Sequence, residues 1–213
     1  MVLGAHNLTY SRLGDGNAVQ STLPMTTSSS GSMLLACVGR GDLSVNVPTT
    51  DNKGNTFVQL GTTHEYNIWR GSGTSLYACA PAVGGSGHVV SAVKPPNDEV
   101  TLSVVEVRGG RYLQDLKWNE VPSGQPLTSA SVTTTGPALL VAWWWGDASG
   151  AYDKTAVPNN GFSVIDAVLY EGWLVQGAVA VRQVSQAGTY NVTWAATPQQ
   201  GAQLWIAAVQ ASA

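Results

Sequence analysis

Charged residues are scarce in this chain of 213 residues. Lys and Arg number 10 and Asp and Glu 13, so that 11% of the residues are charged. Ordinary soluble domains carry roughly 25%. The few cations are scattered and form no basic stripe that could neutralise a phosphate backbone. We therefore expect no nucleic acid partner, and the abundance of Gly, Ser, Thr and Val favours β-structure over surface helices.

Signals for membrane insertion and export are also lacking. Residues Met1–Leu8 have neither the basic n-region nor the apolar h-region of a secretory signal. No stretch approaches the length of a membrane span. We expect no membrane insertion, and the chain is either kept without export or begins after a removed signal or an upstream domain.

Cysteine is rare, with only Cys37 and Cys79 present. Each lies within an apolar, strand-like run, where a reduced cysteine behaves as a small core residue. The pattern predicts two buried thiols. The alternative is a cross-strand disulfide in an exported protein.

Metal and cofactor motifs are few. The three histidines lie far apart, and none has a second ligand at metal spacing, so we expect no cofactor and no transition metal site. Asp51, Asn52 and Asn55 offer a weak calcium candidate around a central glycine. The absence of a downstream Glu at the required spacing favours a hydrogen-bonded turn there instead.

Strand signals dominate what is present. Runs of β-branched and aromatic residues alternate with clusters of Gly, Pro, Asn and Asp, and no window has helical periodicity. We predict an all-β fold, a two-sheet β-sandwich or jelly roll, as a single domain over residues 1–213. The expected strands are 32–39, 43–47, 55–63, 65–70, 74–80, 87–93, 98–108, 127–135, 138–146, 162–169, 172–184, 188–195 and 202–211.

An internal repeat relates the two halves of the chain. Leu34–Asp42 aligns with Leu139–Asp147, and three further blocks of turns and strands follow in the same order. The repeat is predicted to cover 32–108 and 137–211. Residues 109–126 between them are too rich in Leu, Tyr and Trp for a solvated linker, and we expect this connector to pack.

The first repeat resembles a known group of β-sandwich modules. The turn Asp51–Phe57, a strand from Leu76, a Gly-Val segment near 87–90 and a Val-rich strand that includes Glu106 follow in an order similar to that in phage structural or tail proteins and large bacterial surface proteins. The resemblance implies a β-sandwich fold in a virion, extracellular or cell-surface setting. It transfers no catalytic residues.

Aromatic residues are the most informative excess. Among eight tryptophans, Trp143, Trp144 and Trp145 are consecutive, and on a strand they must alternate faces. We therefore expect at least one indole to lack a core position and to bind a glycan or a protein partner. Tyr152, Trp118 and Tyr112 could extend such a platform. The alternative is that the sandwich buries the run.

These features leave three function classes open. The first is a non-enzymatic binding or assembly protein of a phage virion or tail, which self-associates or contacts other virion proteins or a host-surface glycan. The second is a carbohydrate-binding module of a secreted polysaccharide-degrading enzyme. The third and least favoured is a jelly-roll glycoside hydrolase or polysaccharide lyase, which needs a cleft that holds either two carboxylates, chosen from Glu99, Glu106, Asp147 and Asp166, or a Tyr, a His and an Arg.

Overall fold

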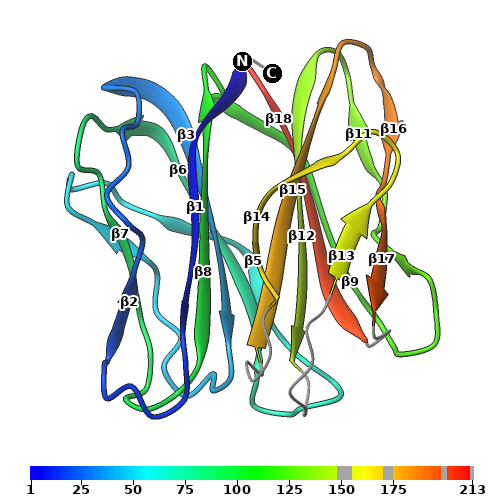
Figure 1. Cartoon of the computed structure of the whole chain (residues 1–213). Coiled ribbons are helices and arrows are strands. Elements are labelled where there is room, and N and C mark those ends of the chain that lie inside the picture. Colours follow the sequence, from blue (N-terminus) through cyan, green and yellow to red (C-terminus); the bar gives the residue numbers. More distant parts are fainter. Residues whose placement is uncertain (148–154, 170–174, 198–200, 212–213) are drawn as a thin grey trace. The chain divides into compact units, whose positions relative to one another are not determined.

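The chain forms an all-β structure, as the sequence predicts. A computed structural model describes residues 1–147, 155–169, 175–197 and 201–211, and no helix occurs among them (Figure 1). The chain divides into two compact units. The first unit is Leu3–Gly109, and the second is Gly110–Ala213 together with Met1–Val2. The prediction of one continuous domain over residues 1–213 stays a prediction.

The first unit is built from a five-stranded sheet and a three-stranded sheet. Their strand orders are β1-β8-β3-β6-β5 and β2-β7-β4, and all the described pairings are antiparallel. The strands are β1 (Val2–Ser11), β2 (Val19–Ser21), β3 (Ser30–Arg40), β4 (Thr50–Asp51), β5 (Val58–Glu65), β6 (Gly73–Val83), β7 (Val90–Val93) and β8 (Val100–Arg108).

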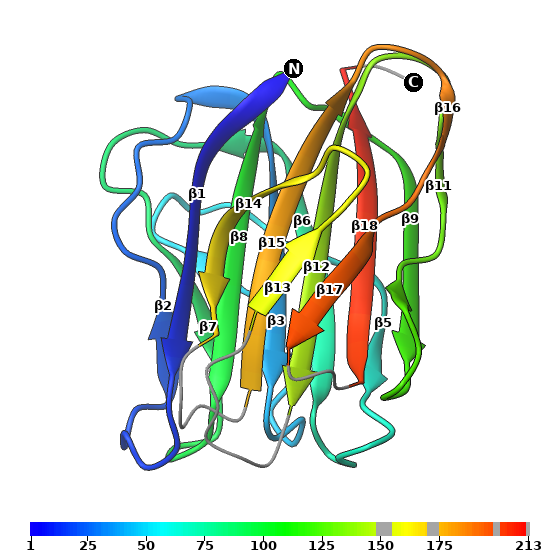
Figure 2. The same ribbon diagram turned by 45° about the vertical axis from the view of Figure 1, so that its right-hand side comes forward.

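The second unit has a five-stranded sheet of order β14-β15-β12-β18-β9, a three-stranded sheet of order β10-β17-β13 and the pair β11-β16. Figure 2 shows β13 and β17 lying across the face formed by β15, β12 and β18. The strands are β9 (Tyr112–Val121), β10 (Leu127–Thr128), β11 (Val132–Thr134), β12 (Ala138–Asp147), β13 (Thr155–Pro158), β14 (Ser163–Val168), β15 (Val175–Val184), β16 (Gly188–Tyr190), β17 (Thr193–Thr197) and β18 (Ala202–Gln210).

The two large sheets have the same topology. In each unit the first strand lies at one edge, beside the last strand of the unit, and the other edge is a hairpin: β1-β8-β3-β6-β5 corresponds to β9-β18-β12-β15-β14. The predicted alignment of the repeat is wrong by one residue at its first block. Leu34 belongs to the core of the first unit, whereas Leu140, and not Leu139, belongs to that of the second. A shift of one residue turns every side chain of a strand to the opposite face of the sheet. Leu140 is therefore the residue that faces its core as Leu34 does.

Each core lies between the large and the small sheet of its unit, which makes each unit a β-sandwich. In the first unit, Leu34, Tyr77 and Leu102 of the large sheet meet Val90 and Ala92 of β7. The corresponding cluster of the second unit draws on all three of its sheets, and its largest members are Leu127, Leu140, Trp144, Phe162, Trp194, Leu204 and Ile206.

The central strands are buried on both faces. Many of the side chains that point away from the two cores are also apolar and almost free of solvent contact, for example Leu35, Val105, Val141 and Val209. A strand covered on both faces reads as a continuous apolar run instead of an alternating one. This explains why β3, β8, β12 and β18 are the segments that the sequence predicts best.

Three predicted segments differ in the structure. Residues 43–47 and 65–70 were expected to be strands, but both lie in connections, one between β3 and β4 and the other between β5 and β6. The connector 109–126 contains β9, an edge strand paired with β18 over its whole length. Its Leu and Trp residues are therefore strand residues, in keeping with the expectation that it packs.

The two cysteines are free thiols on opposite faces of the first large sheet. Cys37 lies opposite Leu76, and Cys79 lies opposite Leu34, so the two are three residues apart along the paired strands. That offset corresponds to roughly 10 Å, beyond the roughly 7 Å that a disulfide can bridge. The prediction of two buried thiols is confirmed.

We predict that neither thiol reacts with Ellman's reagent in the folded protein. Both are buried, and burial raises the pKa of Cys37 to about 12, so almost no thiolate is present at neutral pH. In denaturant, two thiols per chain should react with the reagent immediately. Rapid labelling of the native protein, or fewer than two thiols after unfolding without reductant, would contradict this arrangement.

Candidate functional site

The tryptophan run on β12 is entirely buried. Trp144 lies in the core of the second unit, and Trp143 and Trp145 point to the other face of the sheet, where each is 2% exposed. The expectation that at least one of these indoles forms an exposed platform is therefore wrong. β12 lies in the middle of its sheet, between β15 and β18, and the tryptophan side chains on both of its faces are buried.

Trp143 and Trp118 share one face of the second large sheet. Trp143 lies opposite Trp205 on β18, and Trp205 lies opposite Trp118 on β9. The rings of Trp118 and Trp205 meet edge to face, with centroids 6.5 Å apart. Trp118 is half-buried in this row, and Tyr112 is exposed at the start of the same strand.

The remaining member of the predicted platform, Tyr152, lies outside the described residues. The structure therefore brings together Trp143 and Trp118, places Trp144 on the opposite face, and leaves Tyr112 as the exposed residue among those described.

We predict that Trp144→Ala lowers the free energy of unfolding by about 3–5 kcal/mol, because it leaves a large cavity in the core of the second unit. Chemical denaturation monitored by circular dichroism measures the loss. Tyr112→Ala, at an exposed position, is the control and should change stability by less than about 1 kcal/mol. Equal effects of the two substitutions would argue against the buried placement.

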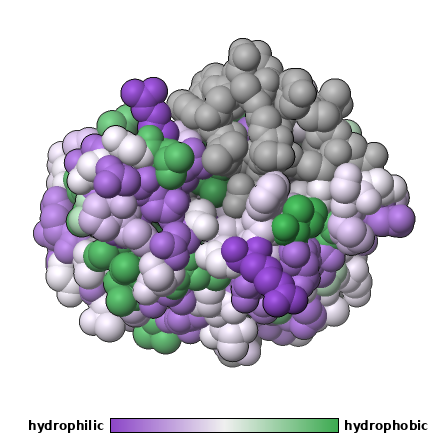
Figure 3. All heavy atoms as spheres, turned by 90° about the horizontal axis from the view of Figure 1, so that it is seen from below, coloured by the Kyte–Doolittle hydropathy of each residue, from purple (hydrophilic) through white to green (hydrophobic). Residues whose placement is uncertain are grey.

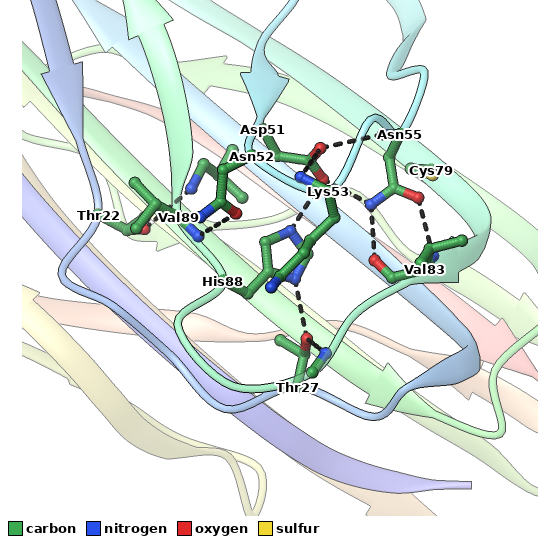
Figure 4. Close-up of polar contacts among 12 residues, drawn as sticks. Thr22, Thr27, Asp51, Asn52, Lys53, Asn55, Cys79, Val83, His88 and Val89 are labelled. Carbon is green, nitrogen blue, oxygen red and sulfur yellow. Dashed lines mark hydrogen bonds and ion pairs between the residues drawn. The ribbon is translucent and has the colours of Figure 1, made fainter.

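The weak calcium candidate is a tightly hydrogen-bonded turn (Figure 4). Asp51 accepts hydrogen bonds from the backbone N–H groups of Lys53 and Asn55, each at 3.0 Å, and from the Asn55 side-chain amide at 2.5 Å. Gly54 adopts φ +77°, which closes the turn. The Asp51 oxygens therefore face N–H donors, as the favoured turn interpretation of this sequence requires.

The two asparagines of this turn act as clamps on neighbouring segments. Asn52 accepts the N–H of Val89 at 3.0 Å, and Asn55 accepts the N–H of Val83 at 2.8 Å. Each amide also donates to a backbone carbonyl, of Gly87 and Val83 respectively. Among the residues that the structure describes, no group of three His, Cys, Asp or Glu side chains could hold a metal ion.

A buried histidine links this turn to the chain before β3. Asp51 and Thr27 lie on either side of the His88 ring, at 2.8 Å from Nε2 and Nδ1 respectively. Because the ionised Asp51 carboxylate can only accept, Nε2 of His88 donates to it, and the Thr27 hydroxyl oxygen also accepts the N–H of Gly85 at 3.1 Å. The side chains of Asp51 and His88 are fully buried. This Thr-His-Asp chain joins three segments and offers no accessible nucleophile.

The charge of Asp51 is set by two opposing effects. Burial raises its pKa, but the hydrogen bonds from Asn55, His88 and Lys53 lower it, and the net pKa lies below its usual value. A carboxyl whose pKa is depressed by folding stabilises the folded state above its unfolded pKa, about 3.9, and loses that contribution as the pH falls through the folded value.

We predict that Asp51→Asn lowers the free energy of unfolding by about 1.5–3 kcal/mol at pH 7, because the bonds to a charged acceptor are replaced by bonds to a neutral one. The difference from the wild type should shrink as the pH falls below about 3.9, the unfolded pKa, toward the lower pKa at which Asp51 of the folded protein is protonated. Urea unfolding at several pH values measures it. Asp42→Asn is the control, because the Asp42 carboxylate accepts hydrogen bonds from the backbone N–H and the hydroxyl of Ser44. A difference that does not depend on pH would count against this account.

The two carboxylates of β8 and its approach are also used internally. Glu106 accepts hydrogen bonds from the backbone N–H groups of Ala5 at 2.9 Å and Ser28 at 2.7 Å. Glu99 accepts from the hydroxyl of Tyr10 at 2.8 Å. Both acids are buried. They hold edge strand β1 and the chain before β3 in place and do not face a cleft as a pair.

One end of the first unit is formed by connections that bind one another. Arg40, the last residue of β3, lies opposite both Gly73 and Val100, so the connections before β6 and β8 and after β3 share this end. The N–H of Gly41 donates to Glu99 O at 3.0 Å, and the N–H of Leu43 donates to Gly71 O at 2.7 Å. These bonds fix the end as one ordered surface.

The connection between β5 and β6, residues 66–72, carries an exposed indole that the sequence interpretation missed. Trp69 is 44% exposed and Ile68 46%, whereas Tyr66 is fully buried. We name residues 66–72 the Trp69 hairpin. Seven of the eight tryptophans lie in the described part of the chain, and of these only Trp69 is exposed.

Hydrogen bonds hold the Trp69 hairpin in one conformation. The carbonyl of Trp69 accepts from both the N–H and the hydroxyl of Ser72, at 3.2 and 2.7 Å. Tyr66 N donates to Ser72 O at 2.8 Å, and Gly71 N donates to Glu65 Oε1 at 3.0 Å. Gly71 has φ +89°, a conformation that favours glycine. In the sequence, Gly71 close after Ile68 and Trp69 is the signal that indicates a turn here.

Comparison with known proteins adds no family. No protein-family model, curated protein or solved structure matches the chain. Within the described residues there is no helix that could span a membrane.

Proposed function

We propose that the chain is a non-enzymatic binding or assembly protein, of the kind found in phage virions or tails, which contacts other subunits or a host-surface glycan. The virion setting is supported by the resemblance of the first repeat to sandwich modules of such proteins. The binding role is supported by one observation above all, the exposed Trp69 on a hairpin whose backbone is fixed by hydrogen bonds.

Rigidity is what gives this observation weight. An indole that already sits in its bound position loses little conformational freedom on binding. Tryptophan is highly buried on average in folded proteins, and it is enriched among the residues that dominate binding energy. The buried use of Asp51, His88, Glu99 and Glu106 in hydrogen bonds supports a scaffold role for the polar residues of the first unit.

The second candidate is a carbohydrate-binding module of a secreted polysaccharide-degrading enzyme. Trp69 supports it as well, because an exposed indole face is a common platform for a sugar ring. The earlier form of this hypothesis, with Trp143 or Trp145 as the platform, is excluded by their burial. A hydrolase or lyase that uses Glu99 and Glu106 as a pair is not supported.

The assembly part predicts self-association. Size-exclusion chromatography with light scattering at micromolar concentration should give more than one copy per particle, with the fraction of oligomer rising with concentration. Trp69→Ala should leave the mass unchanged if the hairpin serves an outside ligand. A monomer across the whole concentration range would count against assembly and leave the binding role alone.

A further inference from the structure

The apolar surface that the Trp69 hairpin exposes is small compared with a whole protein interface. A tryptophan side chain buries at most roughly 250 Å², so the exposed part of Trp69 offers on the order of 100 Å². Ile68 adds a similar amount. Stable protein interfaces bury roughly 800 Å² on each partner. Seen from the end shown in Figure 3, hydrophobic side chains lie in small separate groups among hydrophilic ones.

A single sugar ring matches this size. The flat C–H face of a pyranose covers one indole, and its hydroxyl groups remain in contact with water and polar neighbours. Because the hairpin is already ordered, stacking is not offset by the cost of ordering the loop. The exposed area therefore favours a saccharide over a protein as the occupant of Trp69.

The charge beside the indole selects the kind of saccharide. Arg70 follows Trp69 directly and is exposed. The nearest acid in sequence, Glu65, accepts the N–H of Gly71 at 3.0 Å. An exposed guanidinium next to a stacking surface fits a ring that carries a carboxylate, which it can bind through two parallel hydrogen bonds.

We propose that Trp69 and Arg70 form a subsite for an acidic pyranose, a uronic acid unit of a polysaccharide. The indole of Trp69 stacks on the ring, and the guanidinium of Arg70 pairs with its carboxylate. The inference rests on the proposed binding function and gives it a ligand class.

The test is binding of the full chain to named polysaccharides. Polygalacturonate and alginate are the acidic probes, dextran and xylan the neutral ones, and affinity electrophoresis or calorimetry at low and high salt gives the affinities. We expect the acidic probes to bind and their affinity to fall with salt. Trp69→Ala should weaken this binding about tenfold or more, in line with the loss of one stacking contact.

Arg70→Gln should remove the preference for acidic over neutral probes and most of the salt dependence, while Trp69→Phe should retain part of the affinity. Val83→Ala is the matched control, since Val83 is 54% exposed and lies at the opposite end of β6. Far-UV circular dichroism and thermal unfolding establish that each variant is folded.

Several results would overturn the inference. These are no binding of the wild type to either acidic probe, equal binding of acidic and neutral probes, or a Trp69→Ala variant that binds as the wild type does. An oligomer that binds no acidic polysaccharide refutes this subsite and leaves the proposed assembly function standing. A monomer that binds polygalacturonate through Trp69 supports the subsite and removes the assembly function.

Discussion

Each unit depends on polar side chains that close its large sheet against the small one. Where the chain passes from one sheet to the other, backbone N–H groups lose their strand partners and need other acceptors. In the first unit the Asn7 side chain accepts the N–H of Leu23 at 2.9 Å, and in the second the Asn119 side chain accepts the N–H of Ala130 at 2.6 Å. These amides let an edge strand meet the second sheet without orphaned groups.

Hydrogen bonds between a side chain and the backbone recur at a second position in both units. Val90 donates its N–H to the Thr22 hydroxyl and accepts from the Thr22 N–H, and Val192 does the same with Ser129, at closely similar distances. Such contacts require a hydroxyl or an amide at a fixed place, whereas a core position requires only apolar volume. This explains why the two halves share turn chemistry more visibly than they share core residues.

The sequence predicts the all-β class and the apolar central strands, because their continuous Val, Leu and Ala runs leave few alternatives. It also predicts the turn at Asp51, whose Asn and Gly residues have a specific backbone role. It does not predict the burial of Trp143 and Trp145, because period-2 alternation tells which residues share a face and not whether that face is covered. The sequence predicts a strand at the Trp69 hairpin because its Tyr, Ile and Trp also fit a strand. Only Gly71 and Gly73 indicate the turn.

Low charge has a consequence for the surface as well as for the fold. Several carboxylates form hydrogen bonds or ion pairs with other groups of the chain. Bonds from Lys94 and Ser11 lower the pKa of Asp15. At Glu106 and Asp115, hydrogen bonds lower the pKa by more than burial raises it. Carboxylates held in this way do not compete for an exposed cation. Asp15, Glu106 and Asp115 are bound in this way to other groups of the chain, which leaves the exposed Arg70 as the recognition group that we propose beside Trp69.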